Sequence, residues 1–236
     1  MSTFILNNYL TLIMSIEVLA AVTGVILYRK YKHTTAKYFI FFLVYVIVTA
    51  LIARYTLYVK NNGPLSFLDG TLMERNYWWF TICWKITAVV FFGWYYLKVL
   101  NNAISKRILK ISLIGFSISS MLIILLTLPD FFTKPIPLIS ILGAIIILQC
   151  VYFYFMEILQ SENILTFYKS LTFYISVAIL LYWLIKTPLV FYEQYYRKLD
   201  MNYVSLRRYI NLFVILFMYT TFTIGLIVSK PDKNEG

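Results

Sequence analysis

Residues 77–97 read YWWFTICWKITAVVFFGWYYL, a nearly unbroken run of apolar side chains with one lysine, Lys85, well inside it. An α-helix rises about 1.5 Å per residue, so about 20 such residues cross a hydrocarbon core of about 30 Å. A charged side chain at that depth is costly unless another group compensates it. The stretch therefore predicts a membrane-spanning helix, and it predicts that other spans supply a partner for Lys85.

Six further apolar segments have a similar length, and aromatic side chains crowd the ends of many of them. Aromatic rings at span ends are typical of membrane–water interfaces. The seven predicted spans cover residues 9–28, 38–59, 77–97, 111–128, 136–156, 171–191 and 209–228. Because these spans use most of the 236 residues, we expect one all-α, seven-helix transmembrane domain over residues 1–236 and no separate soluble domain.

The composition argues against an ordinary soluble protein. The chain is 61% hydrophobic and 13% charged, whereas globular domains average about 25% charged residues. The net charge of +11 does not indicate nucleic-acid binding, because the basic residues lie mostly in short loops between apolar runs. The positive-inside bias of membrane proteins produces that distribution. The expected partner is therefore the lipid bilayer, and nucleic acid is not expected.

The distribution of Lys and Arg among the loops also predicts an orientation. With the N-terminus outside, the inner segments hold 11 of these residues and the outer segments hold 7. The first segment lacks the basic start of a signal peptide, so we expect it to be retained as a span. The prediction is a multi-pass protein of the bacterial cytoplasmic (inner) membrane, with the N-terminus outside and the C-terminus cytoplasmic.

Four charged side chains lie within the predicted spans, and the amide Gln149 lies in the fifth span. Glu17 and Lys85 each lie about eight residues, or about 12 Å, below the predicted outer end of a span. They can form an ion pair if their spans are adjacent. Arg54 and Lys186 lie about five residues from the outer ends of spans two and six, and Gln149 lies deeper in span five.

These residues have both structural and functional interpretations. Snorkelling of long side chains to the headgroups explains Arg54 and Lys186, and a packed ion pair explains Glu17 and Lys85. If all four charged side chains face inward, they instead form an outward-facing cavity with three positive groups and one negative group. By charge complementarity, such a cavity favours a small anionic ligand.

An internal repeat is a further hypothesis, because a shift of 132 positions superposes spans one to three on spans five to seven without a gap. The aligned pairs include Glu17 with Gln149, Arg54 with Lys186, and Gly93 with Gly225. Chance similarity between triplets of apolar helices is the alternative. A 3+1+3 parallel repeat resembles the layout of SWEET-type sugar transporters, which implies small-solute transport, although no SWEET sequence motif is present.

A second resemblance is to the uncharacterised seven-helix membrane proteins common in Bacteroidota. The features that carry it are richness in tyrosine, phenylalanine, lysine and isoleucine, the basic sequence YRKYK at residues 28–32, and the aromatic third span. This resemblance covers the whole chain but concerns only these general features of the sequence, and it implies no particular function.

Motifs for chemistry are missing from the sequence. The single histidine, His33, lies in a basic loop, and Cys83 and Cys150 both lie inside apolar runs. Neither a metal or haem site nor a disulfide framework is therefore expected. The sequence has no phosphate-binding loop, nucleophile elbow or zinc-protease motif. We expect no catalysis and no cofactor.

Three classes of function remain. In the first, the protein is a partner subunit of a larger envelope or signalling complex, which the 19% share of aromatic residues favours by offering large contact surfaces. In the second, it is a small-solute transporter or receptor that uses the cavity of Glu17, Arg54, Lys85 and Lys186 for an anionic ligand. In the third, it is a membrane effector that acts by forming homo-oligomers.

Overall fold

The structure is a computed structural model that describes residues 8–59, 63–161, 165–195 and 201–231. Over these residues, seven helical segments are long and apolar enough to cross a membrane. They are Tyr9–Ile26, Ala36–Leu57, Tyr77–Val99, Ala103–Leu126, Pro137–Leu159, Leu171–Val190 and Val204–Val228. The prediction of an all-α, multi-pass membrane protein with seven spans is confirmed.

Most spans are single helices, but the second and third are built from several helical pieces. In chain order the elements are α2 (Tyr9–Ile26), α3 (Tyr28–Tyr31), α4 (Ala36–Ile52), the 3₁₀ turn η1 (Ala53–Leu57), η2 (Ser66–Leu68), α5 (Tyr77–Phe80), the π-helical turn η3 (Thr81–Ile86), α6 (Thr87–Val99), α7 (Ala103–Leu126), α8 (Leu128–Thr133), α9 (Pro137–Leu159), η5 (Phe167–Lys169), α10 (Leu171–Tyr195) and α11 (Met201–Val228).

Two helices extend well beyond the predicted spans. The fourth span was expected at residues 111–128, but α7 begins at Ala103. Its N-terminus is capped by Asn102, whose side-chain oxygen accepts hydrogen bonds from the backbone N–H groups of Ile104 (2.8 Å) and Ser105 (3.2 Å). The seventh was expected at residues 209–228, but α11 begins at Met201. Hydropathy detects only the apolar part of a helix, whereas the helix continues into polar turns where caps satisfy its first N–H groups.

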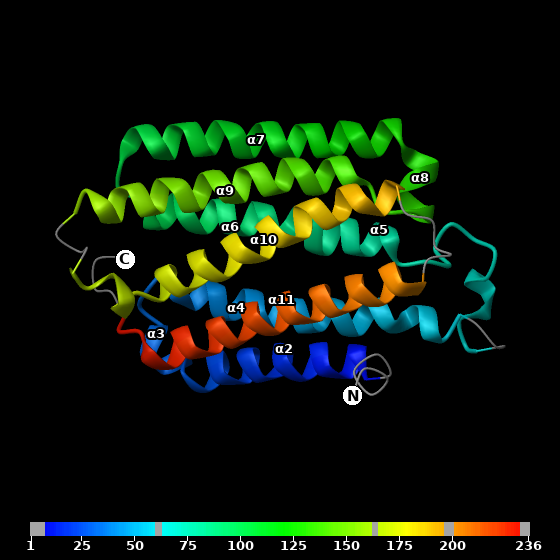
Figure 1. The fold of residues 1–236 in the computed structure, drawn as a ribbon, viewed down its shortest axis with the longest axis horizontal. Coiled ribbons are helices and arrows are strands. Elements are labelled where there is room, and N and C mark those ends of the chain that lie inside the picture. The colour runs from blue at the N-terminus through cyan, green and yellow to red at the C-terminus, as the bar shows by residue number, and fades with distance from the viewer. Residues whose placement is uncertain (1–7, 60–62, 162–164, 196–200, 232–236) are drawn as a thin grey trace.

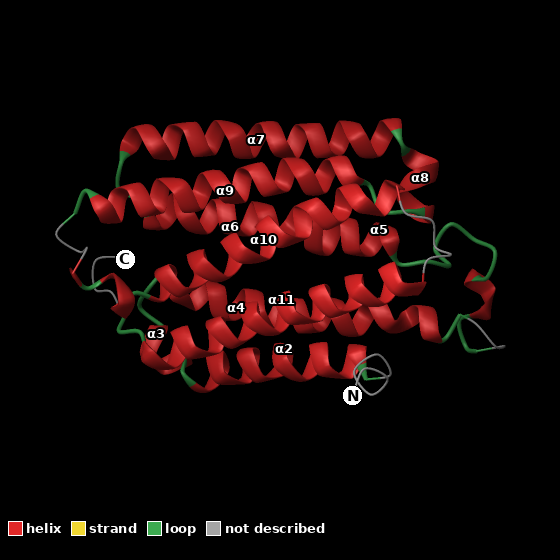
Figure 2. Ribbon diagram, viewed as in Figure 1, coloured by secondary structure: helices red, strands yellow, loops and turns green. Residues whose placement is uncertain are grey.

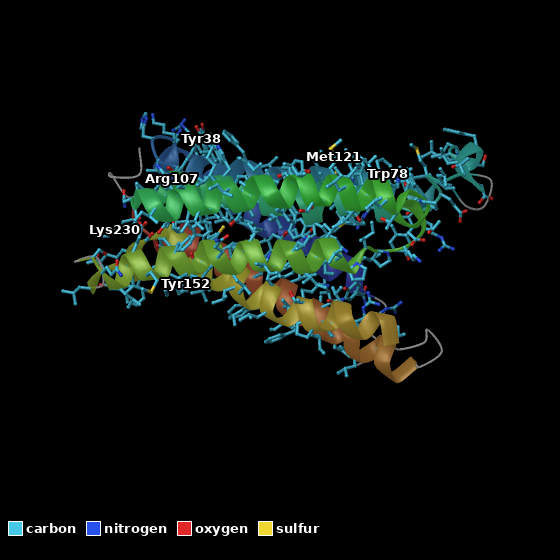
Figure 3. The ribbon with its side chains drawn as sticks, turned by 90° about the horizontal axis from the view of Figure 1, so that it is seen from above. Tyr38, Trp78, Arg107, Met121, Tyr152 and Lys230 are labelled. Atoms are coloured by element: carbon cyan, nitrogen blue, oxygen red, sulfur yellow. The ribbon has the colours of Figure 1, made fainter. Side chains whose placement is uncertain are left out.

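Six of the spans form a closed ring, and the fourth lies outside it. The helix α2 packs against α4 and α11, α10 packs against α11 and α9, and α6 packs against α9 and α4. The fourth span, α7, packs on the outside against α6 and α9 and lies at the edge of the bundle in Figures 1 and 2. Seen from above, α10 and α11 run at an angle to α7 and α9 (Figure 3).

The start of α2 and the end of α11 lie at opposite ends of the bundle, as an odd number of crossings requires (Figure 1). We call these the N-terminal end and the C-terminal end. The outside location of the N-terminal end, the bacterial inner membrane and the 3+1+3 repeat all stay predictions.

An apolar plug fills the ring toward its C-terminal half. We define it by Phe39, Phe42, Phe92, Ile147 and Ile179, all of which are buried. The rings of Phe42 and Phe92 pack edge to face with their centroids 5.2 Å apart. Close contacts of this kind from α4, α6, α9 and α10 exclude water from the middle of the bundle.

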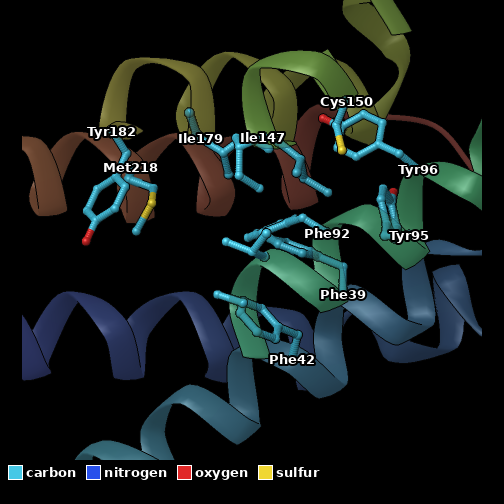
Figure 4. Packing of buried hydrophobic residues seen from close by; sticks show 14 of the residues in the cluster. Phe39, Phe42, Phe92, Tyr95, Tyr96, Ile147, Cys150, Ile179, Tyr182 and Met218 are labelled. Carbon is cyan, nitrogen blue, oxygen red and sulfur yellow. The ribbon is translucent and has the colours of Figure 1, made fainter. Parts of the chain in front are cut away.

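The plug separates two groups of polar side chains. Figure 4 shows Tyr182 on one side of it and Tyr95 and Tyr96 on the other. On the C-terminal side, the Tyr96 hydroxyl is hydrogen-bonded to Ser176 at 2.5 Å, and the Tyr95 hydroxyl to Thr172 at 2.9 Å. These hydroxyl pairs join α6 to α10, and they satisfy polar groups that no water reaches.

The basic loop after the first span closes the ring at the C-terminal end. The Tyr31 hydroxyl donates to the backbone oxygen of Leu226 at 2.8 Å and lies 2.8 Å from the hydroxyl of Ser229. The Lys30 ammonium donates to the carbonyls of Leu226 and Ile227, each at 3.1 Å. The last carbonyls of α11 lack partners within the helix, so these bonds satisfy them and place a positive charge at the negative end of its dipole.

Removing one hydroxyl from this contact is expected to destabilise the fold. The variant Tyr31→Phe loses buried hydrogen bonds to Leu226 and Ser229, and we expect a decrease of about 1–3 kcal/mol in the free energy of unfolding. Thermal unfolding in mild detergent measures this loss of stability. The control Tyr28→Phe removes a hydroxyl from the same loop but keeps the ring packed on Phe41, so we expect little change. Equal losses in the two variants would contradict the assignment.

Candidate functional site

Glu17, a carboxylate within the first span, lies near side chains from η1, α10 and α11. It is half-buried in α2, and Arg54 of η1 is close enough to stabilise its charge electrostatically. The negative charge of Glu17 also interacts electrostatically with the buried hydroxyls of Tyr182 in α10 and Tyr219 in α11. Glu17 is therefore directed into the ring, and Arg54 is its electrostatic partner. The pairing of Glu17 with Lys85 stays a prediction.

A second polar contact lies nearer the N-terminal end and joins the first, sixth and seventh spans. The Lys186 ammonium of α10 donates to the side-chain oxygen of Asn211 in α11 at 2.7 Å. Tyr9 at the start of α2 lies near the Asn211 side chain, and it interacts electrostatically with Tyr182. Lys186 is thus held within the bundle by an amide, which differs from simple snorkelling to the headgroups.

The third span enters this region through an irregular turn. The segment Thr81–Ile86 is a π-helix, and it contains Lys85, which is half-buried. Side-chain hydroxyls form hydrogen bonds to backbone carbonyls of this turn. The Thr87 hydroxyl donates to the carbonyl oxygen of Ile82 at 2.8 Å, and the Tyr45 hydroxyl of α4 donates to the carbonyl oxygen of Cys83 at 2.9 Å. Turns of this type are often found at functional sites.

Trp84 links the π turn to the other polar residues, because its indole N–H donates to the Tyr182 hydroxyl at 3.3 Å. We call the resulting set the polar layer. It lies on the N-terminal side of the apolar plug, and its members are Tyr9, Glu17, Arg54, Trp84, Tyr182, Lys186, Asn211 and Tyr219. Lys85 is adjacent to Trp84 in the chain.

Gln149 is set apart from the other predicted site residues. It lies four residues after Ile145 and three before Tyr152, and those side chains are 55% and 59% exposed. Gln149 itself is half-buried, and because residues at these spacings share one side of a helix, it lies on the side of α9 that carries these two exposed residues. Its sequence partner in the proposed repeat, Glu17, is directed into the ring, so the two positions have different surroundings.

Several members of the polar layer were absent from the sequence prediction. Tyr9 and Tyr182 look like ordinary aromatic residues of a membrane span, and Trp84 looks like part of the aromatic third span. Asn211 was the one detectable signal, because an amide within an apolar run needs a hydrogen-bond partner. That partner is Lys186, whose ammonium group donates to the Asn211 side-chain oxygen at 2.7 Å.

The chemistry available in the polar layer is hydrogen bonding and charge. Within the residues that the structure describes, no three His, Cys, Asp or Glu side chains come together as ligands for a metal ion. The ammonium, guanidinium, amide, indole and phenol groups of the layer are mainly hydrogen-bond donors. Such a set is suited to binding a solute that carries acceptor oxygens.

Comparisons with protein-family models, curated proteins and solved structures return no match. The resemblances to SWEET-type transporters and to seven-helix proteins of Bacteroidota gain no support from them and stay predictions. The seven apolar helices establish a multi-pass membrane protein, and the candidate function depends on the geometry of the polar layer.

Proposed function

We propose that this non-enzymatic membrane protein binds a small anionic solute in the polar layer, as a transporter or a receptor. The observation that carries the proposal is the convergence of Glu17, Arg54 and Lys186 with hydroxyl and amide groups from several spans. Charged and amide side chains within membrane spans are costly, and they commonly mark solute or ion pathways.

The balance of charge favours an anion. Glu17 contributes one negative charge, while Arg54 and Lys186 contribute two positive charges, and Lys85 in the adjacent π turn adds a third. Among these four residues, Glu17 is the one that carries a negative charge. In surroundings of low dielectric constant, positive groups attract an anion more strongly than they would in water.

The layered interior supports a transport cycle. The polar layer lies on one side of the apolar plug, and the hydroxyl pairs Tyr95–Thr172 and Tyr96–Ser176 lie on the other. A solute that crosses the bundle has to pass the plug, so a rearrangement of α4, α6, α9 and α10 around it would alternate access between the two ends.

Reconstituted vesicles provide the test. Purified protein is inserted into liposomes, and tracer uptake and thermal stabilisation are measured for phosphate, sulfate, acetate and succinate. Uptake of an anion indicates a transporter, and saturable stabilisation without uptake indicates a receptor. If none of the anions is bound or carried, the proposal fails.

The variant Lys186→Gln is expected to lower the uptake rate or the affinity about tenfold or more, because it removes the ammonium group that would form a charge-assisted hydrogen bond to the anion. The control Lys134→Gln removes the same charge from an exposed pair with Asp130, where the Nζ–Oδ2 distance is 3.0 Å. We expect that variant to behave like the wild type. Equal losses in both variants would indicate a general effect of surface charge.

A role as a partner subunit is the second candidate, and the position of α7 outside the ring supports it. Mild-detergent extraction from native membranes, followed by sizing and mass spectrometry, tests this role. A stoichiometric protein partner would make the chain a complex subunit, whereas a monomer or small homo-oligomer would favour the solute-binding proposal. An oligomerising effector instead predicts growth arrest and dye entry on overexpression.

A further inference from the structure

A cavity of about 650 Å³ opens at the C-terminal end of the bundle, far from the polar layer. It lies between the end of α9, the start of α7, η5 and the segment after α11. Its polar lining includes Asn101, Asn102, Glu157, Lys169, Ser170 and Lys230. The volume is within the range of about 300–1,000 Å³ that small-molecule sites occupy.

The one carboxylate among the described residues of this lining is already engaged. Glu157 Oε2 accepts the backbone N–H of Asn101 at 2.8 Å, and Oε1 accepts that of Asn102 at 2.9 Å. These bonds hold the carboxylate beside the first turn of α7, where the helix dipole also favours a negative charge. Both carboxylate oxygens of Glu157 are therefore bonded to the loop that precedes α7.

The two lysines of the lining are brought together by the backbone. The N–H of Lys230 donates to the carbonyl of Lys169 at 2.7 Å, which fixes the segment after α11 against η5. In the described part of the chain, the one ion pair within 4.0 Å is that of Lys134 with Asp130, so neither Lys169 nor Lys230 has a carboxylate at that distance. Figure 3 shows Lys230 at the same end of the molecule as Arg107.

We propose that this cavity binds a phosphate or carboxylate group through the ammonium groups of Lys169 and Lys230, assisted by hydroxyl and amide donors such as Ser170 and Asn101. Among the described residues of the lining, two lysines without carboxylate partners and one engaged carboxylate give a positive charge, and ammonium groups form strong hydrogen bonds to anionic oxygens. Because the cavity lies at one end of the bundle, the anion is either a free solute or a phospholipid headgroup. This proposal does not depend on the function of the polar layer.

The test measures binding to the full-length protein without any transport assay. In neutral detergent, the melting temperature is followed while inorganic phosphate or succinate is added, with sodium chloride of equal ionic strength as the baseline. In a second arm, the detergent micelles receive either phosphatidylglycerol or phosphatidylcholine. Saturable stabilisation by the free anions identifies a soluble ligand, and stabilisation by phosphatidylglycerol alone identifies a headgroup.

The double variant Lys169→Gln/Lys230→Gln is expected to weaken the apparent Kd about tenfold or more. The matched control, Lys106→Gln/Lys110→Gln, removes the same charge from the first turns of α7, outside the cavity lining. We expect the control to change the apparent Kd by less than about twofold. If the double variant fails to fold, Lys230→Gln alone replaces it, because Lys230 is exposed. The proposal is overturned if no anion binds, or if the cavity variant and the control weaken binding equally.

Discussion

Replacing Gly225 with leucine is expected to prevent α11 from packing against α10. A Cβ atom at position 225 would lie 2.7 Å from the Cβ and 2.9 Å from the Cγ of Tyr174. Tyr174 Cβ is bonded directly to the backbone of α10, so rotation of a side chain cannot relieve the overlap. Overpacking costs about 1–3 kcal/mol when neighbours can adjust, and we expect about 3 kcal/mol or more here.

The measurement is the yield of monodisperse protein in mild detergent together with its melting temperature. The matched control is Gly115→Leu in α7, where an added Cβ meets nothing within 4 Å, and we expect a normal yield. Gly93→Ala should lie between the two, because its Cβ would meet the terminal methyl groups of Leu113, which can rotate away. A normal yield of the Gly225→Leu variant would show that α10 and α11 separate without cost.

Replacing Lys85 with alanine is expected to abolish anion uptake or binding while leaving the protein folded. Lys85 lies in the π turn that adjoins the polar layer, and a π turn directs its side chains differently from a regular α-helix. A charged group that contacts a bound anion contributes about 1.5–3 kcal/mol, which corresponds to a loss of about tenfold to over a hundredfold. Tracer uptake and melting temperature are measured on the same preparation.

The comparison variant is Arg54→Gln, which removes the electrostatic partner of Glu17. We expect it to lower the melting temperature, because it leaves a half-buried carboxylate without a compensating charge. If Lys85→Ala lowers stability to the same extent and leaves uptake intact, then Lys85 belongs to a structural ion pair and not to a binding site.

The number and approximate positions of the spans illustrate what the sequence predicts well. Apolar runs of about 20 residues have to form helices in lipid, because a helix satisfies every backbone polar group within the segment. The stretch around Lys85 therefore identified a span correctly. Its internal division into α5, the π turn and α6 was not foreseen, because the side chains of Thr81–Ile86 carry no distinctive pattern.

The all-α membrane class and the seven spans follow from the amino-acid sequence alone, because hydropathy and length are properties of each segment. Only the tertiary structure decided which side of each helix faces inward. It directs Glu17 toward Arg54 and places Gln149 on the side of α9 that carries the exposed Ile145 and Tyr152. It also formed the cavity between Lys169 and Lys230 from segments far apart in the chain. The physical reason is that helices apolar on every side give no periodic signal of rotation, so packing between neighbours fixes it.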